Sequence, residues 1–92
     1  MPYIKVANRE YFDEMLAKLG RCSIANAGEL NYLITELINQ YHVTHTKSYQ
    51  IMNDIVGALE SCKAEYQRRI VAPYEDKKRT ENEDVYNEET LR

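Results

Sequence analysis

The sequence predicts an all-α fold: a compact three-helix protein with a long third helix, an N-terminal arm and a docked C-terminal tail. Three observations lead to this prediction. Apolar residues recur at helical spacing in three segments, and no segment alternates apolar and polar residues at a period of two. Only three glycines and two prolines interrupt the chain. Over 92 residues we expect one domain, with the arm over residues 1–7, the three-helix body over 8–72 and the tail over 73–92, docked to about residue 86.

The first helix is expected to begin with Asn8 as its N-cap and to end at Gly20. Between them, apolar side chains stand at positions that share one helical face. These positions are Tyr11, Phe12, Met15, Leu16 and Leu19.

The second helix is predicted by a capping box in Asn26-Ala-Gly-Glu29. The Asn26 side chain would accept a hydrogen bond from the backbone N–H of Glu29, and the Glu29 side chain would reach back. The helix then runs to the HVTHT segment, which breaks the apolar period. Its buried side would carry Leu30, Leu33, Ile34, Leu37, Ile38 and Tyr41.

The third helix is expected to start at Ser48 and to be the longest. Proline donates no backbone hydrogen bond and disfavours helical geometry in the residue before it, so Pro73 would end this helix at Ala72. Its apolar stripe consists of Ile51, Met52, Ile55, Val56, Leu59, Cys62, Tyr66 and Ile70. Because this stripe is longer than two short helices can cover, and a small core is marginal alone, we expect a homo-oligomer.

Charge and cysteine content exclude several classes of protein. Four basic and seven acidic residues lie in 73–92, so the net charge of −3 resides entirely in the tail. A neutral body offers no basic face for a nucleic-acid backbone, and no apolar run has the length of a membrane span. Cys22 and Cys62 are too few for a disulfide framework, and the opening MPYIKVANRE shows no signal-peptide pattern. We therefore expect a cytoplasmic protein with two reduced, buried thiols.

The candidate ligand-binding residues gather around the end of the third helix. Arginine and lysine side chains bind phosphate, and a tyrosine ring can stack on a base. We predict that Arg68, Arg69, Lys77 and Lys78 hold the phosphate of a nucleotide-like small molecule, while Tyr3 and Tyr74 stack on its base. This hypothesis describes a non-enzymatic, oligomeric binding protein that needs no cofactor and has no catalytic residue.

Two alternatives stay open. In the first, the chain is a magnesium-dependent nucleotide pyrophosphohydrolase of the all-α MazG kind, with Glu29, Glu36, Glu60 and Glu65 as metal ligands. Such enzymes use carboxylates three residues apart on one helix, a spacing that these four residues lack. In the second alternative, the chain is a small structural or adaptor protein that binds a host or phage protein.

Several segments resemble a family of small all-helical proteins from phages and bacterial genomes that carries no assigned activity. The matching segments are MPYIK, GELNYLI, SYQIMNDIVGALESCKAEYQRRIVAPYEDKK and ENEDVY, and together they cover residues 1–86. The chain departs from the family at Glu83, where the relatives usually carry glycine, and in the loop between the first two helices. The resemblance implies a phage setting, in which small helical oligomers act as sponges for cyclic-oligonucleotide or ADP-ribose-type immune signals.

Overall fold

The computed structural model describes residues 3–92, which are helical apart from short connections and contain no strand. The all-α prediction is therefore confirmed at the level of fold class. The chain divides into two compact units, Met1–Leu59 and Glu60–Arg92, with the boundary inside one helix.

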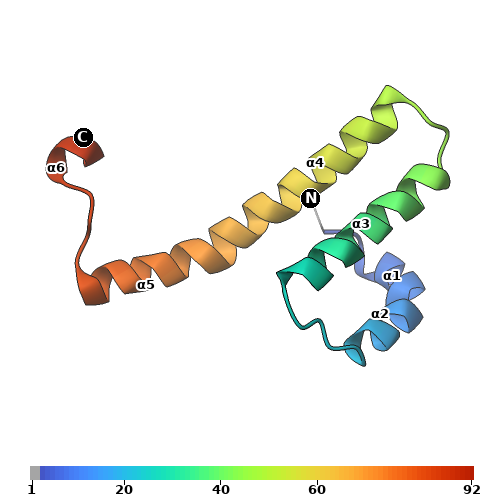
Figure 1. Cartoon of the computed structure of the whole chain (residues 1–92), viewed down its shortest axis with the longest axis horizontal. Coiled ribbons are helices and arrows are strands. Elements are labelled where there is room, and N and C mark those ends of the chain that lie inside the picture. The colour runs from blue at the N-terminus through green and yellow to red at the C-terminus, as the bar shows by residue number, and fades with distance from the viewer. Residues whose placement is uncertain (1–2) are drawn as a thin grey trace. The chain divides into compact units, whose positions relative to one another are not determined.

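The first unit begins with a short helical region and continues into a helical hairpin (Figure 1). The initial region consists of α1 (Val6–Arg9), a 3₁₀ turn (Glu10–Phe12) and α2 (Asp13–Gly20). The hairpin pairs α3 (Ala27–Val43) with the first part of α4 (Tyr49–Tyr66). The end of α2 at Gly20 agrees with the sequence prediction. The predicted N-cap at Asn8 is wrong, because Asn8 lies inside α1 and its backbone N–H donates to Lys5 O.

Local capping fixes the start of each hairpin helix. Asn26 Oδ1 accepts from Glu29 N at 2.9 Å, and Glu29 Oε1 accepts from Ala25 N at 2.7 Å, so the predicted capping box is confirmed. Ser48 Oγ accepts from Ile51 N at 3.3 Å at the start of α4. Both caps satisfy backbone donors that have no partner within the helix.

The hairpin encloses a small core. Ile51 is the buried apolar residue of the described chain, with 8% of its surface exposed, and Leu33, Ile34, Ile38 and Ile55 are half-buried. A polar bridge lies beside them. Tyr41 Oη donates to Asp54 Oδ2 at 3.2 Å, and Gln50 Nε2 donates to Asp54 Oδ1 at 2.7 Å. The expected burial of the cysteines is wrong, because Cys22 and Cys62 are both exposed free thiols.

The second unit is built on a helical segment that continues through Pro73. It consists of the end of α4, a π-helical turn (Gln67–Val71), α5 (Ala72–Asn82) and α6 (Glu88–Leu91). The predicted end of the third helix at Ala72 is therefore wrong. The Pro73 ring would clash with the carbonyl of Arg69 in a regular α-helix and gives it no N–H. The wider π turn, in which Ala72 N donates to Gln67 O, accommodates the ring without ending the helix.

The compact arrangement and the docked tail are not confirmed. Val85 is 92% exposed and Tyr86 is 63% exposed, so docking of the tail remains a prediction. The tail does leave α5 abruptly, because Glu83 has φ 67° and ψ 155°, a conformation that favours glycine.

Candidate functional site

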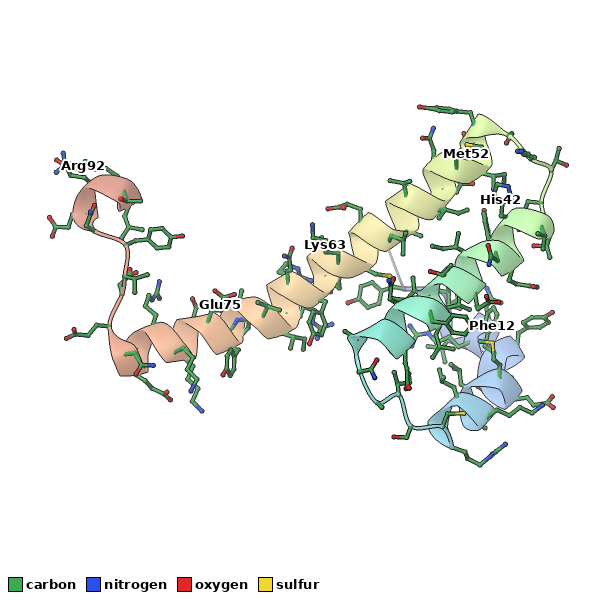
Figure 2. All side chains as sticks on the ribbon, viewed as in Figure 1. Phe12, His42, Met52, Lys63, Glu75 and Arg92 are labelled. Carbon is green, nitrogen blue, oxygen red and sulfur yellow. The ribbon has the colours of Figure 1, made fainter. Side chains whose placement is uncertain are left out.

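The five predicted ligand residues of the second unit lie on two successive helical elements, and we call them the cation–tyrosine cluster. Arg68 and Arg69 stand on the π turn, while Tyr74, Lys77 and Lys78 stand on α5. All are accessible: the side chains of Arg68 and Arg69 are 70% and 60% exposed, and Tyr74 is 60% exposed. Figure 2 shows the side chains of this helical segment extending away from the ribbon.

The π turn determines which members of the cluster share a face. Residues eight apart in an α-helix are rotated by about 80° from one another. The extra residue of the π turn rotates the following helix back by about 100°. Arg69 and Lys77 therefore lie within about 20° of one another around the helix, with Tyr74 and Lys78 on the adjoining side, whereas Arg68 is turned away from Tyr74. The geometry thus groups Arg69, Tyr74, Lys77 and Lys78, and places Arg68 outside that face.

Glu65 neutralises part of the cluster. Its Oε1 lies 2.8 Å from Arg68 Nη2 and 3.8 Å from Arg69 Nη1, and its side chain is only 19% exposed. The ion pair orients the two guanidinium groups on the π turn. Because the arginines are largely solvated, each pair contributes about 1 kcal/mol or less.

Tyr74 and Lys78 form a second contact within the cluster. Lys78 Nζ lies 5.6 Å from the centre of the Tyr74 ring, a cation–π arrangement, and 3.3 Å from Glu81 Oε2. These contacts hold the ammonium group beside the ring. A phosphate that binds Lys78 would therefore lie next to an aromatic surface suited to a base.

A hollow of about 420 Å³ adjoins the cluster but is unsuited to phosphate. It lies between α5 and the tail. Its lining has more carboxylates than cations: the carboxylates are those of Glu75, Asp76, Glu83 and Asp84, and the cations are Lys78 and Arg79. Val85, Tyr86 and Leu91 form its apolar side. An anionic ligand would meet repulsion here, which leaves the open face of the cluster as its candidate site.

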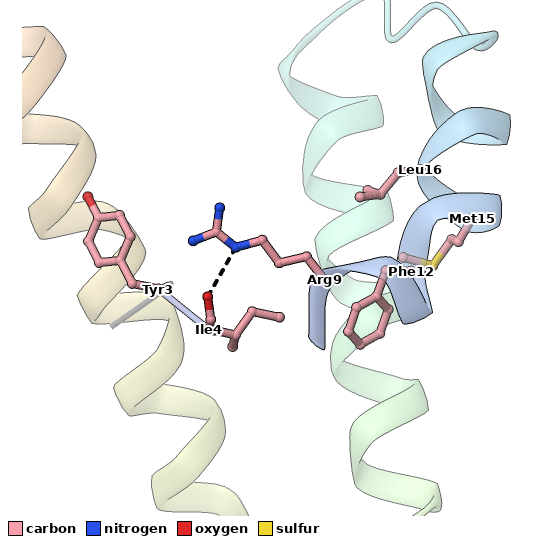
Figure 3. A pocket seen from close by; sticks show the side chains of 6 residues that line it. All are labelled: Tyr3, Ile4, Arg9, Phe12, Met15 and Leu16. Carbon is pink, nitrogen blue, oxygen red and sulfur yellow. Dashed lines mark hydrogen bonds between the residues drawn. The ribbon is translucent and has the colours of Figure 1, made fainter. Parts of the chain in front are cut away.

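The first unit contains a groove that the sequence did not predict. It has a volume of about 490 Å³ and apolar walls from Ile4, Phe12, Met15 and Leu16, with Tyr3 and Arg9 also lining it (Figure 3). Arg9 Nε donates to Ile4 O at 3.0 Å, which holds the guanidinium at the groove. Tyr3 thus belongs to this groove in the first unit and Tyr74 to the second unit, so their joint stacking on one base stays a prediction. The sequence signal that could have revealed the groove is Arg9, a cation that precedes the apolar Phe12 by one helical turn.

The carboxylates of the pyrophosphohydrolase alternative mostly have local partners. Glu29 closes the capping box, Glu60 lies 3.9 Å from Lys63 Nζ, and Glu65 pairs with the two arginines. Glu36 lies in α3, in the first unit, and Glu60 and Glu65 lie in the second. Within residues 3–92, no three histidine, cysteine or acidic side chains come together as a metal site would require.

One phenol in the hairpin has a shifted pKa. Partial burial raises the pKa of Tyr41 above its ordinary value of 10.0, and the hydrogen bond to Asp54 and the negative charge of Asp54 raise it further. The neutral phenol is therefore the form that the hairpin favours.

The fold and the cluster define a small all-α protein with accessible apolar faces and a local group of cations. Comparison with known families identifies the group to which it belongs. Residues 1–85 match a family described as a domain of unknown function, DUF6899, and the chain belongs to that family. No curated protein and no solved structure matches the chain. Among residues 3–92, no helix combines the length and the apolar character needed to cross a membrane.

Proposed function

We propose that this chain is a non-enzymatic binding protein that works as an assembly of copies and holds a phosphorylated, base-containing small molecule. The observation that carries the proposal is the exposure of apolar side chains along every long helix. Leu37 in α3, Val56 in α4 and Ile70 in the π turn are 59%, 65% and 54% exposed. A chain that buries so little apolar surface gains little stability from its own core, so association with further copies is the natural source of the missing burial.

The ligand class follows from the cation–tyrosine cluster. Phosphate oxygens would bind three positively charged side chains, those of Arg69, Lys77 and Lys78. The ring of Tyr74 would stack on the base. Arg68 would contribute indirectly, because it shares the carboxylate of Glu65 with Arg69 and so leaves Arg69 less neutralised. Tyr3 of another copy would stack on the same base as Tyr74. A sponge for cyclic oligonucleotide or ADP-ribose-type signals in a phage-infected cytoplasm is the particular form of this proposal.

Calorimetric titration of the full chain tests the ligand part. The probes are inorganic pyrophosphate, a cyclic dinucleotide and ADP-ribose. The double variant Arg69→Ala with Lys77→Ala is expected to weaken binding by about tenfold or more, since a hydrogen bond to a charged group contributes about 1.5–3 kcal/mol. Lys5→Ala with Lys18→Ala removes two cations elsewhere and should leave affinity unchanged. Equal affinity of the wild type and the cluster variant would reject these ligand residues.

A second candidate function is a partner-protein adaptor. The observation that favours it is the tail, where Val85 and Tyr86 expose 92% and 63% of their surface beside acidic residues. Exposed apolar groups with a charged rim are typical of protein-binding surfaces. An adaptor would bind none of the three probes and would form a stoichiometric complex with a protein from host lysate.

A further inference from the structure

The chain contains both an apolar groove lined by one arginine and an exposed apolar segment that carries carboxylates. The groove of the first unit combines apolar walls with the guanidinium of Arg9. Phe12, Met15 and Leu16 are 41%, 49% and 50% exposed, so the walls are accessible. A segment that fills this groove needs apolar side chains and an adjacent carboxylate.

The segment Glu83–Tyr86 has that composition. Val85 and Tyr86 are apolar and exposed, and they follow Glu83 and Asp84 directly. We propose that the groove of one copy binds the Asp84-Val85-Tyr86 segment of a second copy. This inference rests on the assembly that the proposed function requires, and it names the surface responsible.

The local structure presents this segment in an ordered form. Glu83 turns the chain away from α5 at φ 67°. Asp84 Oδ1 then accepts from Tyr86 N at 2.9 Å, and Asn87 Oδ1 caps α6 by accepting from Thr90 N at 2.9 Å. A segment held between two such turns loses less conformational freedom on binding than a free tail.

Charge favours this pairing. The tail holds seven acidic residues against four basic ones, whereas the guanidinium of Arg9 is the charged group that lines the groove. Arg9 uses Nε for Ile4 O, and a guanidinium has further N–H donors on its Nη atoms with which to bind a carboxylate such as that of Asp84. Val85 and Tyr86 would then cover Phe12 and Leu16.

The predicted assembly is head-to-tail. Because the groove and the segment are different surfaces, each copy binds one neighbour through its groove and another through its tail. Such an interface closes into a ring or grows into a chain, and it allows a complementation test that a two-fold interface does not.

Sedimentation velocity of full-length variants provides this test. Val85→Asp removes the tail contact and Arg9→Glu reverses the groove charge, and each variant alone should be a monomer with at least tenfold weaker self-association. An equimolar mixture should form a one-to-one dimer, because it contains one intact groove and one intact tail for each pair. Combining Arg9→Glu with Asp84→Arg in one chain should restore the larger assembly. Lys18→Glu, an exposed cation of α2 that does not line the groove, is the matched control and should assemble as the wild type.

The possible outcomes separate this inference from the proposed function. Far-UV circular dichroism first establishes that each variant retains its helices, and binding of a fluorescent peptide of residues 81–92 to the Val85→Asp chain measures the groove directly. Assembly that survives both single variants, or a mixture that stays monomeric, overturns the tail–groove contact and leaves the proposed function standing. A wild type that is monomeric at every concentration overturns both the contact and the assembly. If the wild type is a monomer and its groove binds the peptide only after Val85→Asp, the tail occupies the groove of its own chain. That result also contradicts binding of the tail to a second copy.

Discussion

Arg68 Nη2 lies 2.8 Å from Glu65 Oε1, and the same oxygen lies 3.8 Å from Arg69 Nη1. One partly buried carboxylate therefore serves two arginines at the start of the cation–tyrosine cluster. Glu65 therefore distinguishes the nucleotide-binding hypothesis from the pyrophosphohydrolase hypothesis. Its negative charge weakens a phosphate site, whereas the metal site of a pyrophosphohydrolase would need it as a ligand.

Glu65→Gln is expected to strengthen binding of inorganic pyrophosphate by about threefold, since it removes a negative charge next to Arg69. The free energy of unfolding should fall by about 1 kcal/mol or less, because both arginines are largely solvated. Calorimetric titration and thermal unfolding measure the two effects. Glu60→Gln is the control, and its pyrophosphate affinity should match that of the wild type. Magnesium-dependent hydrolysis of a nucleoside triphosphate that either substitution abolishes would instead establish the pyrophosphohydrolase.

Pro73→Ala tests the role of the π turn. Alanine restores the N–H that can donate to Arg69 O and removes the clash that favours the π turn. The segment should then become regular α-helix, in which Lys77 lies about 80° from Arg69 around the helix axis. We expect pyrophosphate affinity to fall while helix content is retained or rises, as measured by calorimetry and circular dichroism. Thr80→Ala, an exposed change in α5, serves as the control. Equal pyrophosphate affinity in all three proteins would show that the rotation of Lys77 relative to Arg69 does not affect binding.

Glu83→Gly should stabilise the end of α5. Glutamate at φ 67° is strained by about 1–3 kcal/mol, and glycine adopts that conformation without a clash. The gain is reduced by the greater freedom of glycine in the unfolded chain, so we expect about 1 kcal/mol of added local stability. Hydrogen exchange of the amides in residues 76–86 measures it. Glu81→Gly, inside α5, should instead make these amides exchange faster. Faster exchange in Glu83→Gly would contradict the claim that Glu83 is strained.

The raised pKa of Tyr41 predicts a stability change in alkali. The folded hairpin binds the phenolic proton more tightly than the unfolded chain does, so this contribution is complete below pH 10.0 and is lost as the pH rises further. The melting temperature of the wild type should therefore fall more steeply above that pH than that of Tyr41→Phe. Tyr32→Phe, an exposed tyrosine of α3, should behave as the wild type. Parallel curves for the wild type and Tyr41→Phe would show that Tyr41 is not coupled to folding.

The sequence predicted those features of the fold that depend on neighbouring residues. Asn26 with Glu29, and Ser48 with Ile51, are separated by three positions, so their capping contacts follow from local geometry alone. Pro73 was misjudged because the rule for proline assumes a regular α-helix, whereas the chain widens one turn and continues. Asn8 was misjudged because α1 begins two residues earlier, at Val6, without a side-chain cap, so Asn8 falls inside the helix.

The candidate site was predictable in composition and not in arrangement. The sequence shows that Arg68, Arg69, Lys77 and Lys78 are close along the chain, but the faces they occupy depend on the π turn. The groove at Arg9 escaped prediction because it forms where the extended residues Tyr3 and Ile4 meet the helical residues from Phe12 to Leu16. No single periodicity describes such a junction.

The central claim is an assembly of copies that retains an intact ligand, and native mass spectrometry tests it most directly. The purified full-length chain is measured alone and with cyclic dinucleotide, ADP-ribose and nucleoside triphosphate plus magnesium. We predict a defined oligomer that keeps one of these compounds unconverted, with the bound mass lost in the Arg69→Ala, Lys77→Ala variant. A monomer that binds none of them, or a nucleotide that is hydrolysed, would contradict the account.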